Sequence, residues 1–193
     1  MQESIFREND IRGQYPNELN ESVIKEIAKG IAKKCYQEGV TKIAVGRDGR
    51  LSGESLLSNF CEAISEYGID INNIGLATSP MLYFAAKKEE SKSGIMITGS
   101  HNPKNYNGIK MVINNNSVSG SEILSLIKNN EICLNNSTKG EISFNNIKEN
   151  YINEVIENIQ YDISKLKVVV DSGNGAAGYV APELFKKLGC DVI

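Results

Sequence analysis

Apolar positions recur along the chain at two spacings, and the spacing separates the expected helices from the expected strands. A spacing of three and four residues is typical of an amphipathic helix that buries one face. Asn20, Ser52 and Ser119 precede such stretches as candidate N-caps, and Glu122 completes a capping box with Ser119. The pattern predicts helices over 21–38, 53–67, 80–86, 120–127, 147–159 and 180–188.

Short continuous apolar runs between these helices predict strands over 43–45, 69–74, 93–97, 108–113, 141–144 and 166–170. Their alternation with helices predicts an α/β fold. We expect a first domain over 1–146, with three layers, α/β/α, around a mixed and mostly parallel sheet. The run at 166–170 is rich in β-branched residues, so we expect a strand that is buried on both faces.

Residues 147–193 predict a linker helix followed by the start of a second, similar domain. After the strand at 166–170 the pattern holds one helix, and the chain stops at Ile193 inside the next expected strand. One strand, one helix and the beginning of another strand cannot close a sheet. We therefore expect the second domain to be truncated in this chain.

The composition is that of an ordinary globular protein, and it narrows the possible partners. Hydrophobic residues make up 40% of the 193 residues and charged residues 23%, with a net charge of -3. This mildly acidic balance argues against a nucleic-acid partner and against attraction to anionic lipid. No signal peptide and no stretch of membrane-spanning length is visible, so we expect a cytoplasmic protein without a membrane partner. The sequence indicates no oligomeric state.

The four cysteines, Cys35, Cys61, Cys133 and Cys190, are widely spaced and form no CxxC pair. This spacing argues against a zinc site and against a disulfide framework. Cys35 and Cys61 fall on the apolar faces of expected helices, where a free thiol behaves as a small hydrophobe. We expect the cysteines to be reduced core residues.

The segment Thr98-Gly99-Ser100-His101-Asn102-Pro103 places a hydroxyl nucleophile beside the only histidine of the chain. It comes after the expected strand at 93–97, and its glycine, asparagine and proline favour an abrupt turn that exposes the Ser100 hydroxyl. Loops on rigid scaffolds often carry catalytic residues. On composition alone the same residues also make an ordinary solvated turn, and that alternative stays open.

Three further segments favour the catalytic interpretation, because they stand in a fixed order around the serine. They are Phe6-Arg7-Glu8-Asn9-Asp10-Ile11-Arg12-Gly13, Gly46-Arg47-Asp48-Gly49-Arg50 and Tyr106-Asn107-Gly108-Ile109-Lys110. With the serine loop, they resemble the ordered motifs of the α-D-phosphohexomutases, the family that includes phosphoglucomutase and phosphomannomutase. The segment Val168-Val169-Val170-Asp171-Ser172-Gly173-Asn174-Gly175 is similar to the opening of that family's second domain. The resemblance runs along essentially the whole chain and covers the first and part of the second of four family domains.

This resemblance implies an enzyme that interconverts hexose 1-phosphate and hexose 6-phosphate. It implies that Ser100 carries a phosphoryl group and passes it to the sugar phosphate, through a hexose 1,6-bisphosphate that also acts as activator. Transfer of this kind needs cationic groups around the phosphoryl oxygens and groups that exchange protons. By resemblance Ser100, Lys110, His101 and Arg12 are catalytic, with Lys110 as the acid/base candidate and Arg12 as the charge-stabilising candidate.

Arg7, Arg50 and Asn102 are the residues expected to bind the phosphate of the substrate, since arginine binds phosphate bidentately. Arg47 either contacts substrate or shapes its own loop. For both Arg47 and Arg50, the alternative to a substrate contact is a solvated turn, or an ion pair with Asp48 or Glu54 that shapes the loop. His101 relays a proton, donates a hydrogen bond to the phosphate, or fixes the loop, and the sequence leaves these roles open.

The resemblance also implies Mg²⁺, with the phosphoserine oxygen of Ser100 as one ligand. The family's Asp-Gly-Asp loop, which supplies three further ligands, has no counterpart in this chain, and its sugar-specificity loop and C-terminal phosphate loop are also missing. One oxygen cannot define an octahedral site for a hard cation. We therefore expect the 193 residues to be inactive, or nearly so, on their own.

Two other hypotheses remain. Gly173-Asn174-Gly175-Ala176-Ala177-Gly178 satisfies the GxGxxG pattern of a dinucleotide-binding module, after an expected strand and before an expected helix. Against that module, Asp171 stands close to where the pyrophosphate would bind, and the acidic residue expected about 20 positions on falls at or past the chain end. The other hypothesis is a non-catalytic remnant.

Within the family, the Thr-Gly form of the serine loop favours glucose and mannose phosphates over glucosamine phosphate.

Overall fold

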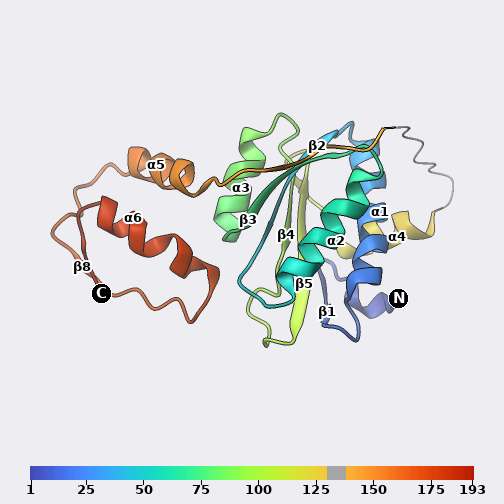
Figure 1. Ribbon diagram of the computed structural model, residues 1–193, viewed down its shortest axis with the longest axis horizontal. Helices are drawn as coiled ribbons and strands as arrows, with labels where there is room; N and C mark the ends of the chain where they lie inside the picture. The colour runs from blue at the N-terminus through green and yellow to red at the C-terminus, as the bar shows by residue number, and fades with distance from the viewer. Residues whose placement is uncertain (130–137) are drawn as a thin grey trace.

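The largest sheet is mixed and mostly parallel, as the alternation of helices and strands predicts (Figure 1). The structure is a computed structural model that describes residues 1–129 and 138–193. Within these residues the strand order is β1-β5-β4-β2-β3-β7, with the short β6 beside β5. β5 runs antiparallel to its neighbours, and the other ladders of this sheet are parallel. The strands are β1 (Ile11–Gln14), β2 (Lys42–Arg47), β3 (Asp70–Leu76), β4 (Gly94–Ile97), β5 (Tyr106–Ile113), β6 (Asn116–Ser117) and β7 (Ile142–Phe144).

β1 is a strand that the apolar pattern does not predict. It has four residues, of which Ile11 alone is a large apolar side chain, so it is too short to show a periodicity of two. It pairs with β5, and this pairing sets Ile11 opposite Ile109 and Arg12 opposite Gly108. Tertiary pairing therefore places Arg12 in a strand at one edge of the sheet.

Helices cover both faces of this sheet (Figure 1). The sheet lies between two apolar cores. The face under α1, α2 and α4 buries Val45 and Ile109, whereas the face under α3 buries Ala44 and Met96. Neighbouring residues of a strand point to opposite faces, which explains this division. Among the described residues, no helix is both long and apolar enough to span a bilayer. These helices are α1 (Glu21–Gln37), α2 (Gly53–Ser65), α3 (Ser79–Lys88), α4 (Gly120–Lys128) and α5 (Lys148–Asn158).

Two of the three expected caps hold their helices, and the third has another partner. The Asn20 side chain accepts a hydrogen bond from the backbone N–H of Ser22 at 3.1 Å, and the Ser119 hydroxyl caps α4 in the same way. Ser52 precedes α2 but makes no capping bond. Its hydroxyl accepts a hydrogen bond from Nδ2 of Asn107 at 2.8 Å instead, which ties the start of α2 to β5.

The C-terminal part of the chain leaves the large sheet through α5, which docks on α3. The rings of Phe84 and Tyr151 meet edge to face with centroids 5.7 Å apart, and Nζ of Lys88 pairs with Oε2 of Glu154 at 3.1 Å. The expected domain boundary between residues 146 and 147 stays a prediction. Beyond α5 lie a two-stranded parallel sheet, a short 3-10 helix and one further helix: β8 (Lys167–Val168), η2 (Ala176–Tyr179), α6 (Ala181–Lys187) and β9 (Asp191–Val192).

The prediction of a strand buried on both faces at 166–170 is wrong for this chain. The strand here is β8, of two residues, and Leu166 and Val169 on either side of it are 53% and 72% exposed. Its sheet contains β8 and β9. Burial on both faces requires a layer of helices or strands over each face. The exposure of Leu166 and Val169 shows that the pair β8–β9 is not covered in this way.

Lys33 is a buried charge that holds two helices together. Its side chain belongs to α1 and is 2% exposed. Nζ donates to the carbonyl oxygen of Leu126 at 2.9 Å and to that of Asn129, at the C-terminal end of α4. A cation at this end of a helix also meets the negative pole of the helix dipole. Lys33 is therefore part of the α1–α4 interface.

We predict that Lys33→Met lowers the free energy of unfolding by about 1–3 kcal/mol, because the terminal carbonyls of α4 lose a buried charged donor. Urea denaturation followed by circular dichroism measures this change. Lys25→Met, at an exposed position of the same helix, is the matched control and should shift stability by less than about 0.5 kcal/mol. Equal effects of the two substitutions would contradict the structural role of Lys33.

Candidate active site

Segments from three strands meet at one edge of the large sheet. β2 and β4 are parallel neighbours, so the chain leaves this edge after Arg47 and again after Ile97. β5 is antiparallel to β4, so it starts at the same edge, at Tyr106. The carboxyl ends of parallel strands are where α/β sheets bind their ligands. Three of the four motifs found in the sequence therefore lie together.

Ser100 presents its hydroxyl in the loop after β4. The residue is exposed and adopts a left-handed backbone conformation, with φ at 52°. This conformation is uncommon for a residue other than glycine, and it persists where the surroundings fix it. The backbone N–H of Ser100 donates to Oγ1 of Thr98 at 2.9 Å, and Oγ of Ser100 lies 3.4 Å from Nδ1 of His101.

Asp48, in the loop after β2, organises the serine loop from the neighbouring strand. Its Oδ2 accepts hydrogen bonds from Oγ1 of Thr98 at 2.7 Å and from the backbone N–H of Gly99 at 3.2 Å. The same oxygen lies 3.3 Å from Nε of Arg50. The sequence offers Asp48 as an ion-pair partner of Arg47 or Arg50, but nothing in the pattern of the chain assigns it the contacts with Thr98 and Gly99.

Arg50 reaches across the serine loop, and its guanidinium donates to main-chain oxygens. Nη2 donates to the carbonyl oxygens of Ser100 and Asn102, at 3.0 and 2.6 Å. Nη1 donates to those of Pro103 and Tyr106, at 2.6 and 2.8 Å. The Arg50 side chain is 13% exposed. Phosphate binding by Arg50 stays a prediction, and in this structure its donors point into the protein.

Arg12 and Lys110 share one face of the sheet. Arg12 lies opposite Gly108, and Lys110 is two residues further along β5, so both side chains point the same way. Lys110 lies opposite Met96 of β4, which identifies this face as the one covered by α3. The Arg12 guanidinium forms an ion pair with Asp10 at 2.5 Å, with both side chains largely buried.

The two remaining expected phosphate ligands lie in different surroundings. Arg7 is exposed and lines a shallow cavity of about 270 Å³ together with Arg12. Its carbonyl oxygen accepts a hydrogen bond from the N–H of Gly120 at 2.7 Å, which fixes the N-terminal loop on the start of α4. Nδ2 of Asn102 donates to the carbonyl oxygen of Gly99 at 2.8 Å, within the serine loop. Their roles toward a substrate stay predictions.

A cleft of about 510 Å³ opens beside Ser100. It is lined by the loop 48–51, by the serine loop with Lys104, and by the glycine-rich loop 173–176. The first and last of these loops lie close together, because a Cβ built on Gly49 would lie 3.6 Å from the carbonyl oxygen of Asn174. Sequence reasoning did not single out Lys104 or Asn174 as separate candidates. Their positions next to the serine and inside the glycine-rich loop are the signals that point to them.

The glycine-rich loop differs from a dinucleotide-binding turn in the helix to which it leads. It opens into the short 3-10 helix η2, and α6 begins after that, whereas the dinucleotide pattern opens directly into an α-helix. The carboxylate of Asp171 accepts a hydrogen bond from the backbone N–H of Gly173 at 2.9 Å. A negative charge therefore lies at the turn where a pyrophosphate would bind. The geometry favours a wall of the serine cleft over a pyrophosphate site.

The described residues do not form a metal site around Ser100. Over 1–129 and 138–193, no three His, Cys, Asp or Glu side chains come together as possible ligands. Asp48 is the carboxylate next to the serine loop, and its Oδ2 faces Thr98, Gly99 and Arg50. An octahedral cation needs several oxygen ligands, so Mg²⁺ remains a prediction from the resemblance.

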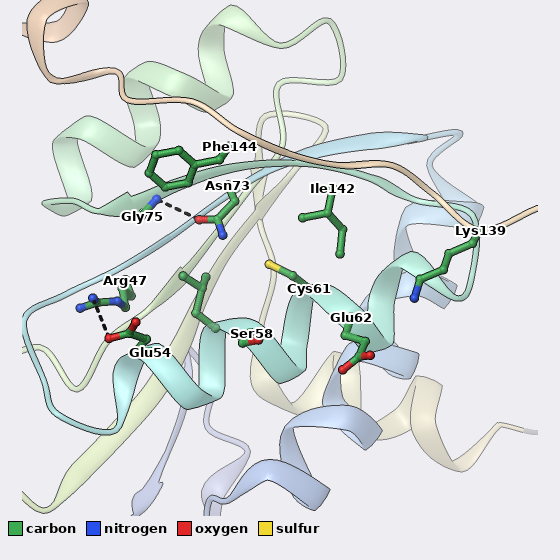
Figure 2. Close-up of a pocket in the computed structure, with 11 residues that line it drawn as sticks. Arg47, Glu54, Ser58, Cys61, Glu62, Asn73, Gly75, Lys139, Ile142 and Phe144 are labelled. Carbon is green, nitrogen blue, oxygen red and sulfur yellow. Dashed lines mark hydrogen bonds and ion pairs between the residues drawn. The ribbon is translucent and has the colours of Figure 1, made fainter.

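A second cavity, of about 500 Å³, lies between α2 and the β3–β7 edge of the sheet (Figure 2). Arg47 stands at one end of it and pairs with Glu54 at 3.6 Å, while its Nη1 donates to the carbonyl oxygen of Asp48 at 3.1 Å. Arg47 thus shapes its own loop in this structure, one of the two roles that the sequence leaves open. Cys61 lines the same cavity from α2.

Comparison with known proteins gives the family. A family model described as phosphoglucomutase/phosphomannomutase, alpha/beta/alpha domain I, matches residues 3–131. The chain is 41% identical over 194 residues to a phosphomannomutase/phosphoglucomutase of Pseudomonas syringae pv. tomato, covering 99% of this chain and 41% of that protein. It is 37% identical over 198 residues to a phosphoglucomutase of Neisseria meningitidis serogroup B, covering 97% and 43%. A phosphoglucomutase/phosphomannomutase family protein of Burkholderia thailandensis superposes with a TM-score of 0.91 at 33% identity, covering 100% and 44%.

The chain therefore belongs to the phosphoglucomutase/phosphomannomutase family. This confirms the resemblance carried by the four motifs, and the layered α/β/α fold with a mostly parallel sheet is confirmed as well. The chain spans about two fifths of the length of the curated relatives it matches.

The cysteines lead to a prediction about reactivity. Cys35 and Cys61 are free and buried on helices, as expected, and Cys133 lies outside the described residues. Burial raises the pKa of both thiols to about 12, so at pH 8 almost none of either is thiolate. We predict that iodoacetamide leaves both unmodified in the folded protein and alkylates both in urea, as read by peptide mass mapping. Labelling of Cys61 under native conditions would show that the cavity in Figure 2 opens to reagent.

Proposed function

We propose that the protein containing this chain is a phosphohexomutase, an isomerase that interconverts hexose 1-phosphate and hexose 6-phosphate through phosphorylated Ser100 and a hexose 1,6-bisphosphate. Family membership supports a sugar phosphate as the substrate. The observation that carries the proposal is the exposed Ser100 hydroxyl, on a left-handed residue at the mouth of a cleft of about 510 Å³. A carrier serine needs this access, because both donor and acceptor phosphates must reach one oxygen.

In the proposed step, a hydroxyl of the hexose monophosphate attacks the phosphorus of phospho-Ser100. The bond from phosphorus to Oγ breaks as the new phosphorus–oxygen bond forms, and Oγ keeps the electron pair. The attacking hydroxyl loses a proton and Oγ gains one, so acid/base groups are required. We assign Lys110 to this exchange, with His101 placed 3.4 Å from Oγ to pass a proton to or from it. The bisphosphate then returns its other phosphoryl group to Ser100 by the reverse step.

Positive charge at the site completes the proposal. Arg12 offsets the charge that develops on the equatorial phosphoryl oxygens, and Arg7 and Asn102 bind the phosphate that is not transferred. Mg²⁺ is the proposed cofactor, and it would neutralise phosphoryl charge when bound. Among the described residues Ser100 is its one proposed ligand.

The substrate class and location are proposed on the same family membership. Glucose and mannose phosphates are the proposed substrates, in keeping with the names of the relatives, and a hexose 1,6-bisphosphate is the proposed activator because it can phosphorylate Ser100. We propose a cytoplasmic location, since the free thiols of Cys35 and Cys61 suit a reducing compartment. The 193 residues by themselves are proposed to be inactive.

The test is an intact-mass measurement of the whole protein before and after incubation with glucose 1,6-bisphosphate. We predict that wild type gains one phosphoryl group, that Ser100→Ala gains none, and that its mutase activity falls by roughly 10⁴-fold or more, as when other nucleophiles are removed. Ser117→Ala is the control, because Ser117 is exposed at the opposite end of the sheet and should behave as wild type.

Two results would contradict the proposed function. A wild-type protein that never carries a serine-linked phosphate favours a non-catalytic remnant. A Ser100→Ala variant with full activity shows that another residue carries the phosphoryl group.

A further inference from the structure

Arg50 has a bonding pattern that suits main chain better than a ligand. Its two terminal nitrogens donate to four carbonyl oxygens, spread over residues 100 to 106, and its Nε faces Asp48 at 3.3 Å. A guanidinium carries five N–H donors in a rigid planar fork. Four carbonyl oxygens and one carboxylate can accept from all five N–H donors. None is then left for a substrate phosphate.

The guanidinium also lies directly against Gly99. A Cβ built on Gly99 would lie 2.3 Å from Cζ of Arg50 and 2.4 Å from its Nε, distances that real atoms do not adopt. Gly99 is therefore required for close approach, and any side chain at this position would push Arg50 away from the carbonyls. The loop and the arginine fit as one unit.

The serine loop needs such support, because its backbone leaves the sheet. β4 ends at Ile97 and β5 begins at Tyr106. The N–H of Thr98 still donates to the carbonyl oxygen of Gly108 at 2.9 Å, and the residues after Thr98 have no strand ladder. Ser100 sits in a left-handed conformation that costs energy for a residue with a Cβ. Asp48 fixes the entry to the loop through Thr98 and Gly99, and Arg50 fixes its centre and exit.

We propose that Asp48 and Arg50 form a clamp that positions Ser100 for phosphoryl transfer by holding the backbone of its loop, with Arg50 acting as a positioning residue. The role rests on the proposed function, since the transfer being positioned is that of Ser100. The clamp itself is a structural device that is measurable without turnover. The clamp role and the role of Arg50 as a phosphate ligand predict different effects of substitutions at Arg50 and Gly99.

Arg50→Lys separates the two roles. Lysine keeps the positive charge, so a phosphate ligand would be partly preserved, but one ammonium with three donors cannot reach four carbonyls and Asp48. Gly99→Ala is the second variant, because it keeps Arg50 and its charge while its Cβ displaces the guanidinium. Lys87→Met, an exposed charge removed from α3, is the control.

The experiment measures amide exchange and steady-state kinetics in the whole protein. Amide hydrogen exchange of peptides covering 98–106 should be about tenfold faster in Arg50→Lys and Gly99→Ala, and unchanged elsewhere and in Lys87→Met. For glucose 1-phosphate, kcat should fall by about 10–100-fold while KM stays within about threefold, since small misplacement of a reacting group costs about that much in rate. Arg50→Lys should be close to Arg50→Met in both quantities.

Unchanged exchange at 98–106 in the two variants would overturn the clamp. So would a rise in KM at constant kcat, which identifies Arg50 as a phosphate ligand. If Arg50→Lys does not fold, Gly99→Ala decides by the same readouts. A wild-type protein without mutase activity would remove the proposed function, and the exchange measurement would still decide whether the clamp exists.

Discussion

The carboxylate of Asp48 is the contact on which the arrangement of the candidate site depends. It stands at the end of β2 and holds Thr98 and Gly99, which come directly after the neighbouring strand β4. It also faces Nε of Arg50, whose terminal nitrogens hold the rest of the serine loop. A loop without a strand ladder must satisfy its backbone groups in some other way. Here Asp48 and Arg50, from the loop after the adjacent strand, bond many of these groups, and hydrogen bonds within the loop, such as that from the N–H of Asn102 to the carbonyl oxygen of Gly99 at 3.0 Å, bond others. Ser100 itself is exposed.

Both faces of the sheet bury an apolar core, and one of them also carries two charged candidate residues. Ile109 faces the core under α1, α2 and α4, whereas Lys110, the next residue, faces the other side. Arg12 lies on that second side too, because it is paired with Gly108. A strand alternates its side chains between faces, so a single strand serves both the core and the candidate site. Lys33 is a charged residue with a structural role, because its buried ammonium group links α1 to the end of α4.

Much of the fold is predictable from the chain because local pattern and tertiary burial agree. The helices after Asn20 and Ser119 begin at their caps, and the apolar runs of β2, β3 and β4 become buried strands. β1 escapes prediction because a strand of four residues is defined by its partner. The expected burial of 166–170 fails because β-branched composition predicts a strand, while burial depends on layers that its small sheet does not have.

The sequence by itself determined the family and the layered α/β/α class, and it singled out the loop of Ser100 as the candidate reactive loop, since these rest on motifs and periodicity that are local in the chain. Tertiary structure decided what each charged residue contacts. Arg47 turns toward Glu54, Arg50 toward main-chain carbonyls, and Arg12 toward Asp10. All three are arginines in motifs, and spacing cannot distinguish them. Their partners come from strand register and from loops that meet across the sheet edge, which exist once the chain has folded.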